Sequence, residues 1–408
     1  MVGYLNTGMK IQCYGCEACA QICPVSAITM VEDEEKFRYP LVDKEKCIDC
    51  GLCHKACPHE HPFEPVLENK TAFGGQHIDS NVLAESTSGG AFTAIIDGWC
   101  DENYVIFGAM SKGIKVYHSY VEDTKDAYKL KKSKYVQSEM GVAYKDVKRF
   151  LKEGKKVLFS GTPCQVSALK AFLGNTDKEN LLTVEVVCEG VPTPYYMDKY
   201  EEYIINKYGS SIDKLDYRFK NLKTKNNKPW GKWDFQMMET TLKNGKCVKK
   251  DRWFNPFWSI WLKHLMSRPS CYECPFAKSE RNADITLGDL WGVHLYCSEL
   301  YFKNSGASLI VCNTKKGKDA LEKAKPYLRG HELKFEDALK YQSPMRKHID
   351  GNNKREEFMV DVKTLDYKTL CEKWATKPTL KLLWQKYVWG NRQKVWLWNL
   401  KNRRKDNA

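Results

Sequence analysis

The sequence predicts an α/β body with a mixed, partly parallel sheet, preceded by a small cysteine-rich domain at residues 1–62. Between residues 156 and 187 a strand, a turn, a helix and a second strand follow one another, which is the order of parallel neighbours in an α/β protein. A four-cysteine pattern occurs twice in the first 62 residues. The 408 residues are 42% apolar and 12% aromatic, enough for a sizeable core and for two or three structural units.

The first domain contains two matching runs, CYGCEACAQICP from Cys13 and CIDCGLCHKACP from Cys47. Both have the spacing C-x2-C-x2-C-x3-C-P of bacterial ferredoxins with two [4Fe–4S] clusters, in which the fourth cysteine of each run ligates the other cluster. Two zinc knots are the alternative, but zinc commonly takes pairs of Cys-x-x-Cys. Residues 36–46 alternate in the manner of a small hairpin. The predicted ligand sets are Cys13, Cys16, Cys19 and Cys57 for one cluster, and Cys47, Cys50, Cys53 and Cys23 for the other.

A polar linker is expected at residues 63–82, and regular elements follow it. Apolar spacing predicts helices over 89–99 and 142–153, and a third whose inner face carries Val166, Leu169 and Leu173. Continuous apolar runs predict buried strands at 103–110, 157–159 and 181–187.

Two of these strands lead directly to a cysteine. Cys164 comes a short turn after the strand at 157–159, and Cys188 ends the strand at 181–187. Ligands of open α/β sheets gather at the carboxyl ends of the strands. With Cys271 and Cys274, a Cys-x-x-Cys pair, they make four thiolates, enough for a third [4Fe–4S] cluster. Spacing leaves two other interpretations open: ordinary buried cysteines beside a zinc or redox pair, or a nucleophilic Cys164 with no histidine near it in sequence.

Two polar loops are candidate anion sites. AESTSGGAF, residues 84–92, places hydroxyls and backbone N–H groups at the start of a helix, where they can hold a phosphate. KKSKYVQS, residues 131–138, offers a lysine, a glutamine and serines to an anionic cofactor. The alternatives are an ordinary helix start for the first loop and a solvated face for the second.

Six segments occur in a fixed order: STSGGAF, SKYVQS, FSGTPCQV, VVCEGVP, RPSCYECPF and DITLGDLWG. In this set the chain resembles the beta-subunit family of coenzyme F420-reducing hydrogenases and dehydrogenases, in the form with a fused two-cluster ferredoxin. The resemblance covers about residues 10–345. It implies FAD and one further [4Fe–4S] cluster in the body, with Cys164, Cys188, Cys271 and Cys274 as the cluster ligands.

The resemblance also implies a FAD-binding part at residues 83–165 and a part at 166–345 that holds the third cluster. Arg281, Asp289 and Trp291 belong to the motifs without a defined role. Relatives commonly read Cys-His-Gly where this chain has Cys188-Glu189-Gly190, so a charged carboxylate should lower the potential of a cluster there, and an imidazole proton donor is missing. The residues implied to bind FAD are Ser86, Ser88, Gly89, Gly90, Lys134, Tyr135, Gln137, Ser138, Gly161, Thr162, Pro163 and Gln165.

The preferred hypothesis is an iron–sulfur flavoprotein oxidoreductase. Electrons would pass from the ferredoxin clusters through the third cluster to FAD, and on to an unidentified substrate or a deazaflavin. Fused members from anaerobic bacteria are associated with surface-polysaccharide genes, so polysaccharide metabolism is one setting that the resemblance implies. The alternatives are an electron-transfer subunit for a separate catalytic partner and an iron–sulfur scaffold or sensor. A redox partner protein or a ferredoxin is the expected partner.

The net charge of +14 is concentrated at the C-terminus, where residues 373–408 hold ten Lys or Arg and one Asp. A helical, basic, tryptophan-rich tail is expected at 346–408. Such a tail suits an anionic membrane surface, and a helix packed on the body or on a partner is the alternative. No nucleic-acid reader motif is recognisable. The tryptophans concerned are Trp384, Trp389, Trp396 and Trp398.

A cytoplasmic location is expected, with contact to the inner membrane surface through the tail. The N-terminus lacks the pattern of a secretory signal, and no stretch is apolar enough to span a membrane. The 17 cysteines then indicate metal ligands in a reducing compartment. No role is assigned to His118, His264 or His294. Ordinary core or surface positions are expected for Cys100, Cys247, Cys297, Cys312 and Cys371.

Overall fold

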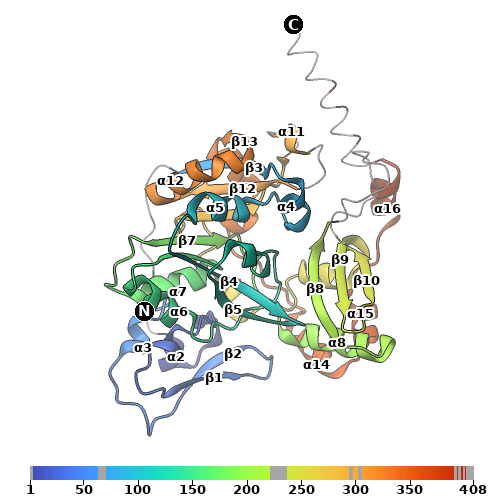
Figure 1. Cartoon of the computed structure of the whole chain (residues 1–408). Coiled ribbons are helices and arrows are strands. Elements are labelled where there is room, and N and C mark those ends of the chain that lie inside the picture. The colour runs from blue at the N-terminus through green and yellow to red at the C-terminus, as the bar shows by residue number, and fades with distance from the viewer. Residues whose placement is uncertain are drawn as a thin grey trace.

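The computed structural model describes residues 3–62, 70–220, 237–293, 297–301 and 306–389, together with Gln393, Leu397 and Leu400. The body is built on an eight-stranded sheet with the strand order β13-β3-β12-β11-β7-β6-β4-β5 (Figure 1). The four strands β4, β6, β7 and β11 are parallel, and the strands on both sides of them are antiparallel. This confirms the predicted mixed, partly parallel sheet. The strands are β3 (Thr71–His77), β4 (Tyr104–Lys112), β5 (Lys115–Val121), β6 (Lys156–Gly161), β7 (Leu181–Val186), β11 (Ile285–Asp289), β12 (Ser308–Cys312) and β13 (Leu328–Leu333).

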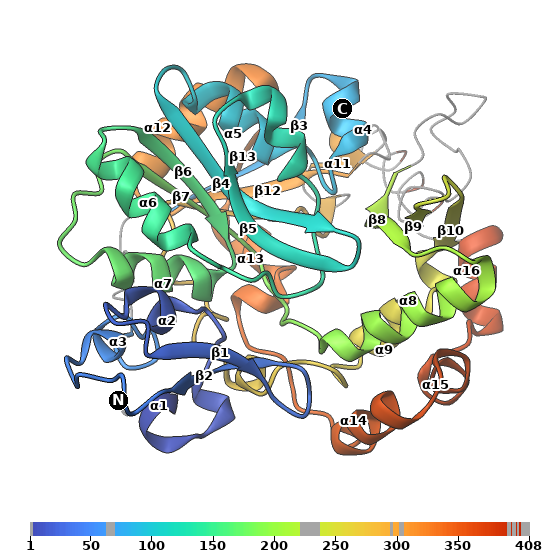
Figure 2. The same ribbon diagram turned by 60° about the horizontal axis from the view of Figure 1, so that its bottom comes forward.

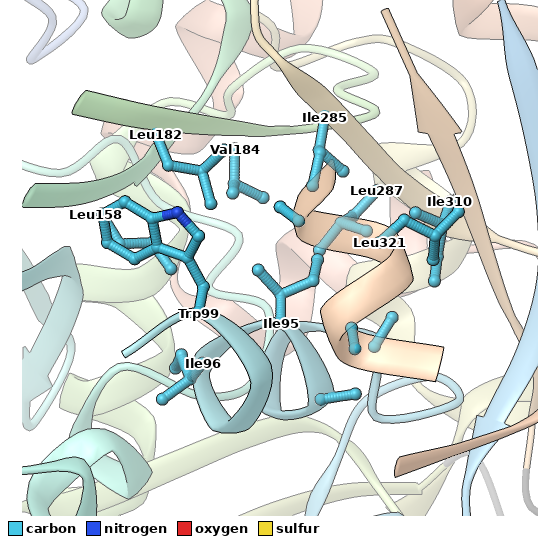
Figure 3. Packing of buried hydrophobic residues seen from close by; sticks show 14 of the residues in the cluster. Ile95, Ile96, Trp99, Leu158, Leu182, Val184, Ile285, Leu287, Ile310 and Leu321 are labelled. Carbon is cyan, nitrogen blue, oxygen red and sulfur yellow. The ribbon is translucent and has the colours of Figure 1, made fainter. Parts of the chain in front are cut away.

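Helices cover both faces of this sheet, so its central strands are largely buried on both sides. Ile95, Ile96 and Trp99 of α5 (Ala91–Trp99) pack on one face against Leu158, Leu182, Val184 and Leu287, and α12 (Lys315–Ala324) lies beside α5 (Figure 3). On the other face α6 (Ala143–Lys152) and α7 (Pro163–Leu173) form a second cluster. The helices and strands expected between residues 89 and 187 are therefore all present. Short helices in this part of the body include α4 (Ser80–Glu85) and α13 (Phe335–Lys340).

The cysteine-rich domain packs against α6 and α7 through Ala18 and Ala56, which belong to the same apolar cluster as Val166 and Leu169 (Figure 2). Its hairpin pairs β1 (Ile28–Glu32) with β2 (Arg38–Val42). The prediction at residues 36–46 was therefore only half right, because the first strand precedes that segment. The short helices are α1 (Tyr4–Thr7), α2 (Ala18–Ile22) and α3 (Leu52–Lys55).

A second, three-stranded sheet of order β10-β9-β8 is not apparent from the sequence. Its core includes Tyr196, Trp258, Phe358 and Trp374. The strands and helices of this unit are β8 (Ile212–Phe219), β9 (Met237–Leu242), β10 (Cys247–Asp251), α8 (Pro194–Tyr208), α9 (Pro256–Trp261), α14 (Arg355–Thr364) and α15 (Tyr367–Trp374).

Two predicted boundaries are wrong. Strand β3 lies inside the expected linker at 63–82, and helices α14 and α15 of the expected tail at 346–408 belong to the core of the three-stranded unit. Beyond them α16 (Leu380–Tyr387) exposes Trp384, whereas Trp396, Trp398 and residues 63–69 lie outside the described residues. Among the described helices, none has the length and apolar character required to cross a membrane.

Candidate functional site

A cavity of about 670 Å³ lies at the carboxyl ends of β6, β7 and β11 and is closed on one side by α9. This volume is within the range of small-molecule and cofactor sites. The structure thus brings together loops from distant parts of the chain. Of the residues predicted to bind FAD, those that line the cavity are Ser86, Ser88, Gly90, Lys134, Tyr135, Gln137, Ser138, Gly161, Thr162, Pro163 and Gln165.

Gly89 is the exception, because it faces the sheet. A Cβ atom at this position would lie 2.3 Å from the carbonyl oxygen of Gly75 and 2.4 Å from the backbone nitrogen of Ser308. Its N–H donates to the Ser308 hydroxyl at 2.9 Å. Glycine is therefore required here for close packing of the loop on β3 and β12. Its contact with a cofactor stays a prediction, and the packing supplies a structural reason for the glycine.

Cys164, Cys188, Cys271 and Cys274 all line the same cavity. Cys164 occupies the first turn of α7, whose start is fixed by a capping box between Thr162 and Gln165. Burial raises the pKa of Cys188, and the charges of Cys271, Cys164 and Cys274 raise it further. The four sulfurs are thus within electrostatic reach of one another, although they come from three distant segments.

A buried ion pair holds the Cys271–Cys274 loop on the sheet. The Nε atom of Arg281 donates to Glu185 of β7, and its guanidinium donates to the carbonyl of Phe276 at 2.6 Å. Thr286 of β11 donates to the same Glu185 oxygen at 2.8 Å. Arg281 and Glu185 are 2% and 0% exposed, so neither charge has solvent as a substitute partner.

Replacing Arg281 by Met should lower the free energy of unfolding by about 3–5 kcal/mol, because Glu185 would keep a buried charge without its counterion. Chemical denaturation of the anaerobic protein measures this. The matched control is the double variant R281M/E185M, which removes both charges and should regain most of the loss. Equal stability of R281M and wild type would contradict the structural role of the pair.

The cavity wall carries cationic side chains and ring N–H groups. Burial lowers the pKa of Lys134 to about 7, while its Nζ atom donates to the carbonyls of Leu130 and Lys131 at 3.2 and 2.7 Å. The indole nitrogens of Trp258 and Trp261 are buried without a hydrogen-bond partner among the described residues. Unpaired buried donors are costly, so this wall is suited to a ligand with acceptor atoms.

An ion pair also lines the cavity. Arg218 of β8 donates to Asp289 at the end of β11, with 2.5 Å between Nη1 and Oδ2. Burial opposes ionisation of Asp289, but the Arg218 charge lowers its pKa below the usual value. Asp289 therefore stays charged and fixes Arg218, which lines the cavity and was not singled out in the sequence.

His118 also lines the cavity, although the sequence indicated no role for it. Its Nδ1 atom lies 2.7 Å from the Ser138 hydroxyl and its Nε2 atom 3.0 Å from the Ser160 carbonyl. Burial lowers its pKa to about 4, so the ring is neutral at pH 7. Since Gln165 donates to the same Ser138 hydroxyl at 2.9 Å, His118 orients two residues of the predicted FAD site.

In the first predicted cysteine set of the N-terminal domain, the sulfurs lie within electrostatic reach of one another. Burial raises the pKa of Cys16, and the charges of Cys19, Cys57 and Cys13 raise it further. In each run the residues on both sides of the second cysteine have positive φ, and they wrap the loop tightly: Gly15 and Glu17 around Cys16, Asp49 and Gly51 around Cys50.

Contacts to the body offset the cost of the left-handed backbone at Glu17. Its carboxylate accepts hydrogen bonds from the backbone N–H groups of Met140 and Gly141 at 3.2 and 3.3 Å, and from Arg38 at 2.8 Å. The loop around Cys16 is therefore docked on the body by one of its own residues.

Tyr14 lies between the first cysteine set and the cysteine set of the cavity. Burial raises its pKa above the usual range, and the charges of Cys274 and Cys164 of the body and of Cys57 of the first set raise it further. Its ring contacts Phe276 edge-on at 5.3 Å and lines the cavity. In the other set Cys50 is exposed to solvent. The three sets thus run in the order surface, domain interface, cavity.

Comparison with known proteins gives separate matches for the N-terminal domain and for the body. Residues 154–335 match the family model of the coenzyme F420 hydrogenase/dehydrogenase beta subunit, C terminus, and residues 12–61 match that of the 4Fe-4S dicluster domain. In fold, the chain is similar to one in the F420-reducing [NiFe] hydrogenase complex of Methanosarcina barkeri, with a TM-score of 0.43 and 16% identity over 76% of this chain and 92% of the other.

The curated relatives match the N-terminal domain. An uncharacterized ferredoxin of Methanocaldococcus jannaschii is 49% identical over 53 residues, 12% of this chain and 32% of that protein. One component of the Na⁺-translocating ferredoxin:NAD⁺ oxidoreductase complex of Acetobacterium woodii is 43% identical over 53 residues, 13% of this chain and 15% of that protein. One component of the anaerobic dimethyl sulfoxide reductase of Escherichia coli is 39% identical over 56 residues, 13% and 25% of the two proteins. The chain spans a third or less of each of these relatives.

Proposed function

Because this iron–sulfur electron-transfer protein has a 4Fe-4S dicluster domain, and its residues 154–335 belong to the coenzyme F420 hydrogenase/dehydrogenase beta-subunit family, we propose that it is a flavin-dependent oxidoreductase. The observation that carries the proposal is the convergence of four distant cysteines on the wall of one cavity that all but one of the predicted FAD residues also line. A cluster and a flavin held there would be neighbours.

The residues of the cavity fit FAD. The Ser86–Gly90 loop precedes α5 and offers backbone N–H groups to a phosphate, except for that of Gly89. The hydroxyls of Ser86 and Ser88 donate instead to the carbonyls of Val82 and Ala307, at 2.7 and 2.6 Å, and fix the shape of the loop. Lys134 is a buried amine whose pKa would rise again beside an anion, and the indole N–H groups of Trp258 and Trp261 are free to donate. His118 and Gln165 keep the Ser138 hydroxyl in place.

The three cysteine sets would hold three [4Fe–4S] clusters: Cys47, Cys50, Cys53 and Cys23 at the surface, Cys13, Cys16, Cys19 and Cys57 at the interface, and Cys164, Cys188, Cys271 and Cys274 at the cavity. Clusters supply one-electron transfer and a flavin joins it to two-electron chemistry. The chain itself positions Tyr14 between the inner two sets and leaves Cys50 accessible to a redox partner.

Anaerobic purification tests the proposal directly. The protein should contain about twelve irons per chain, from three four-iron cubes, and a flavin absorbance that is released on denaturation. About eight irons and no flavin would refute both the third cluster and the flavoenzyme, and would leave a ferredoxin joined to a body of another purpose.

The second candidate is an electron-transfer subunit that serves a separate catalytic protein, and the exposed Cys50 set is compatible with it. The two functions differ in one measurement. Reduced pure protein should be reoxidised by a small acceptor if the cavity is an active site, and only in the presence of a partner if it is not. A deazaflavin acceptor and a setting in polysaccharide metabolism are predictions from the family resemblance alone.

Contact of the C-terminal segment with a membrane surface is also still a prediction. Trp384 and Trp389 are 59% and 47% exposed, so both can reach an interface. Flotation with anionic vesicles, compared between the full chain and a chain ending at residue 375, would decide it.

A further inference from the structure

A second group of metal-ligand side chains lies at the edge of the eight-stranded sheet, away from the cavity. Cys297 precedes the short helix α11 (Ser298–Tyr301), Glu299 is part of it, and His331 belongs to the edge strand β13. None of the three lines the cavity. In Figure 1 both α11 and β13 lie at the end of the molecule opposite the N-terminal domain.

The ligand atoms of these residues form a compact triangle, with all three within 4.8 Å of one another. The Cys297 sulfur lies 3.2 Å from Oε1 of Glu299 and 3.9 Å from Nδ1 of His331. The third side, from His331 Nδ1 to Glu299 Oε1, is 3.1 Å. Two groups that can each bind a metal thus converge on one carboxylate oxygen.

The triangle has the dimensions of one face of a zinc tetrahedron. Zinc binds sulfur at about 2.3 Å and nitrogen or oxygen at about 2.0–2.2 Å, so the ligand atoms of a tetrahedral site are about 3.4–3.6 Å apart. Each of the three observed distances differs from these values by about 0.4 Å or less. A cation can therefore be accommodated by small side-chain rotations without a backbone movement.

The donor set and its exposure define the kind of metal. One thiolate, one imidazole and one carboxylate suit a borderline-soft ion such as zinc, whereas magnesium and calcium require oxygen ligands. Cys297 is only 1% exposed, but the side chains of His331 and Glu299 are 49% and 58% exposed, which gives an ion a path from solvent. The fourth position of the tetrahedron would then face water.

We propose that Cys297, Glu299 and His331 form a Zn²⁺ site with three protein ligands and one exchangeable position. The ion would connect α11 to β13, the outermost strand of the sheet. Without the ion, the side chains of Cys297, Glu299 and His331 contact one another directly at this place. This site is independent of the iron–sulfur and flavin assignments.

Zinc and iron should be measured by elemental analysis on the full anaerobic protein after incubation with ZnCl₂ and removal of free metal. Wild type should retain about one zinc per chain, and C297A and H331A should each retain almost none at unchanged iron content. C312A and H348A are matched controls, since Cys312 is a buried cysteine of β12 in a different apolar cluster from Cys297 and His348 lines the cavity, and both should keep the zinc.

The H331A variant keeps the proposal falsifiable if C297A fails to fold, because the His331 side chain is half exposed. Wild type that retains no zinc, or H331A that retains as much zinc as wild type, would overturn the proposal. In that case the triangle is a hydrogen-bonded group that closes the edge of the sheet.

Discussion

Replacing Cys188 by Ala should reduce the iron content from about twelve to about eight atoms per chain, because a four-iron cube that loses one of four thiolates is not retained. Cys188 is the best position, since the charges of the three other proposed ligands of this cluster, Cys271, Cys164 and Cys274, raise its pKa. Flavin content should be unchanged, because none of the residues proposed to bind FAD is altered. Reduction of a small acceptor at the cavity should be lost. Iron analysis and flavin absorbance measure these effects.

The matched control is C312A. Cys312 is a fully buried cysteine of the same sheet whose thiol donates to the carbonyl of Gly317 at 3.3 Å. It should keep about twelve irons and the wild-type activity, apart from a modest loss of stability from the small cavity. If C188A keeps all its iron, or if C312A loses as much as C188A, the four body cysteines do not hold a cluster.

The sequence reveals the cysteine sets because their chemistry depends on local spacing and on strand ends. Both N-terminal runs are short loops, and Cys164 and Cys188 follow strands whose apolar runs are unambiguous. The pair Cys271 and Cys274 joins them only through the fold, which is why spacing alone left zinc and redox interpretations open.

Other parts of the site have no such local signal. Strand β3 reads TAFGGQH, and its two glycines have poor strand propensity, so its segment is typical of a linker. The structure explains the first of them, because a Cβ atom at Gly74 would lie 2.9 Å from the Leu290 side chain. Arg218, Trp258 and Trp261 likewise lack a local signal, because they belong to the three-stranded unit. Its strands lie between residues 212 and 251, and they share a core with α14 and α15, which come about 100 residues later in the chain.

Arg268 shows how such long-range contacts can set a redox property. It is 1% exposed and precedes Cys271 by three residues, yet its guanidinium contacts the N-terminal domain. Nε donates to the Cys13 carbonyl at 2.9 Å, one Nη donates to the Arg38 carbonyl at 3.0 Å, and the same Nη lies 3.6 Å from the Cys13 sulfur. The group also stacks over Tyr39, with 4.3 Å to the ring centroid. A buried positive charge thus faces Cys13, which we propose as a ligand of the interface cluster.

Replacing Arg268 by Met should make the potential of the interface cluster more negative. A positive charge stabilises the reduced cluster, which carries one more electron, so its removal disfavours reduction. A hydrogen bond to a charged group is worth about 1.5–3 kcal/mol. For one electron this corresponds to about 60–130 mV, at 59 mV per tenfold change in equilibrium constant. A redox titration followed by electron paramagnetic resonance measures the shift.

Two further variants separate charge from packing. R268K keeps the charge and loses the planar fork, so it should shift the potential much less than R268M. R355M removes another interface arginine, which pairs with Glu35 and donates to the Ser267 carbonyl without contacting Cys13. It should weaken docking of the N-terminal domain but leave this potential unchanged. If R268M keeps its clusters and shows the wild-type potential, Arg268 only joins the N-terminal domain to the body. It would then have no effect on the reduction potential of the interface cluster.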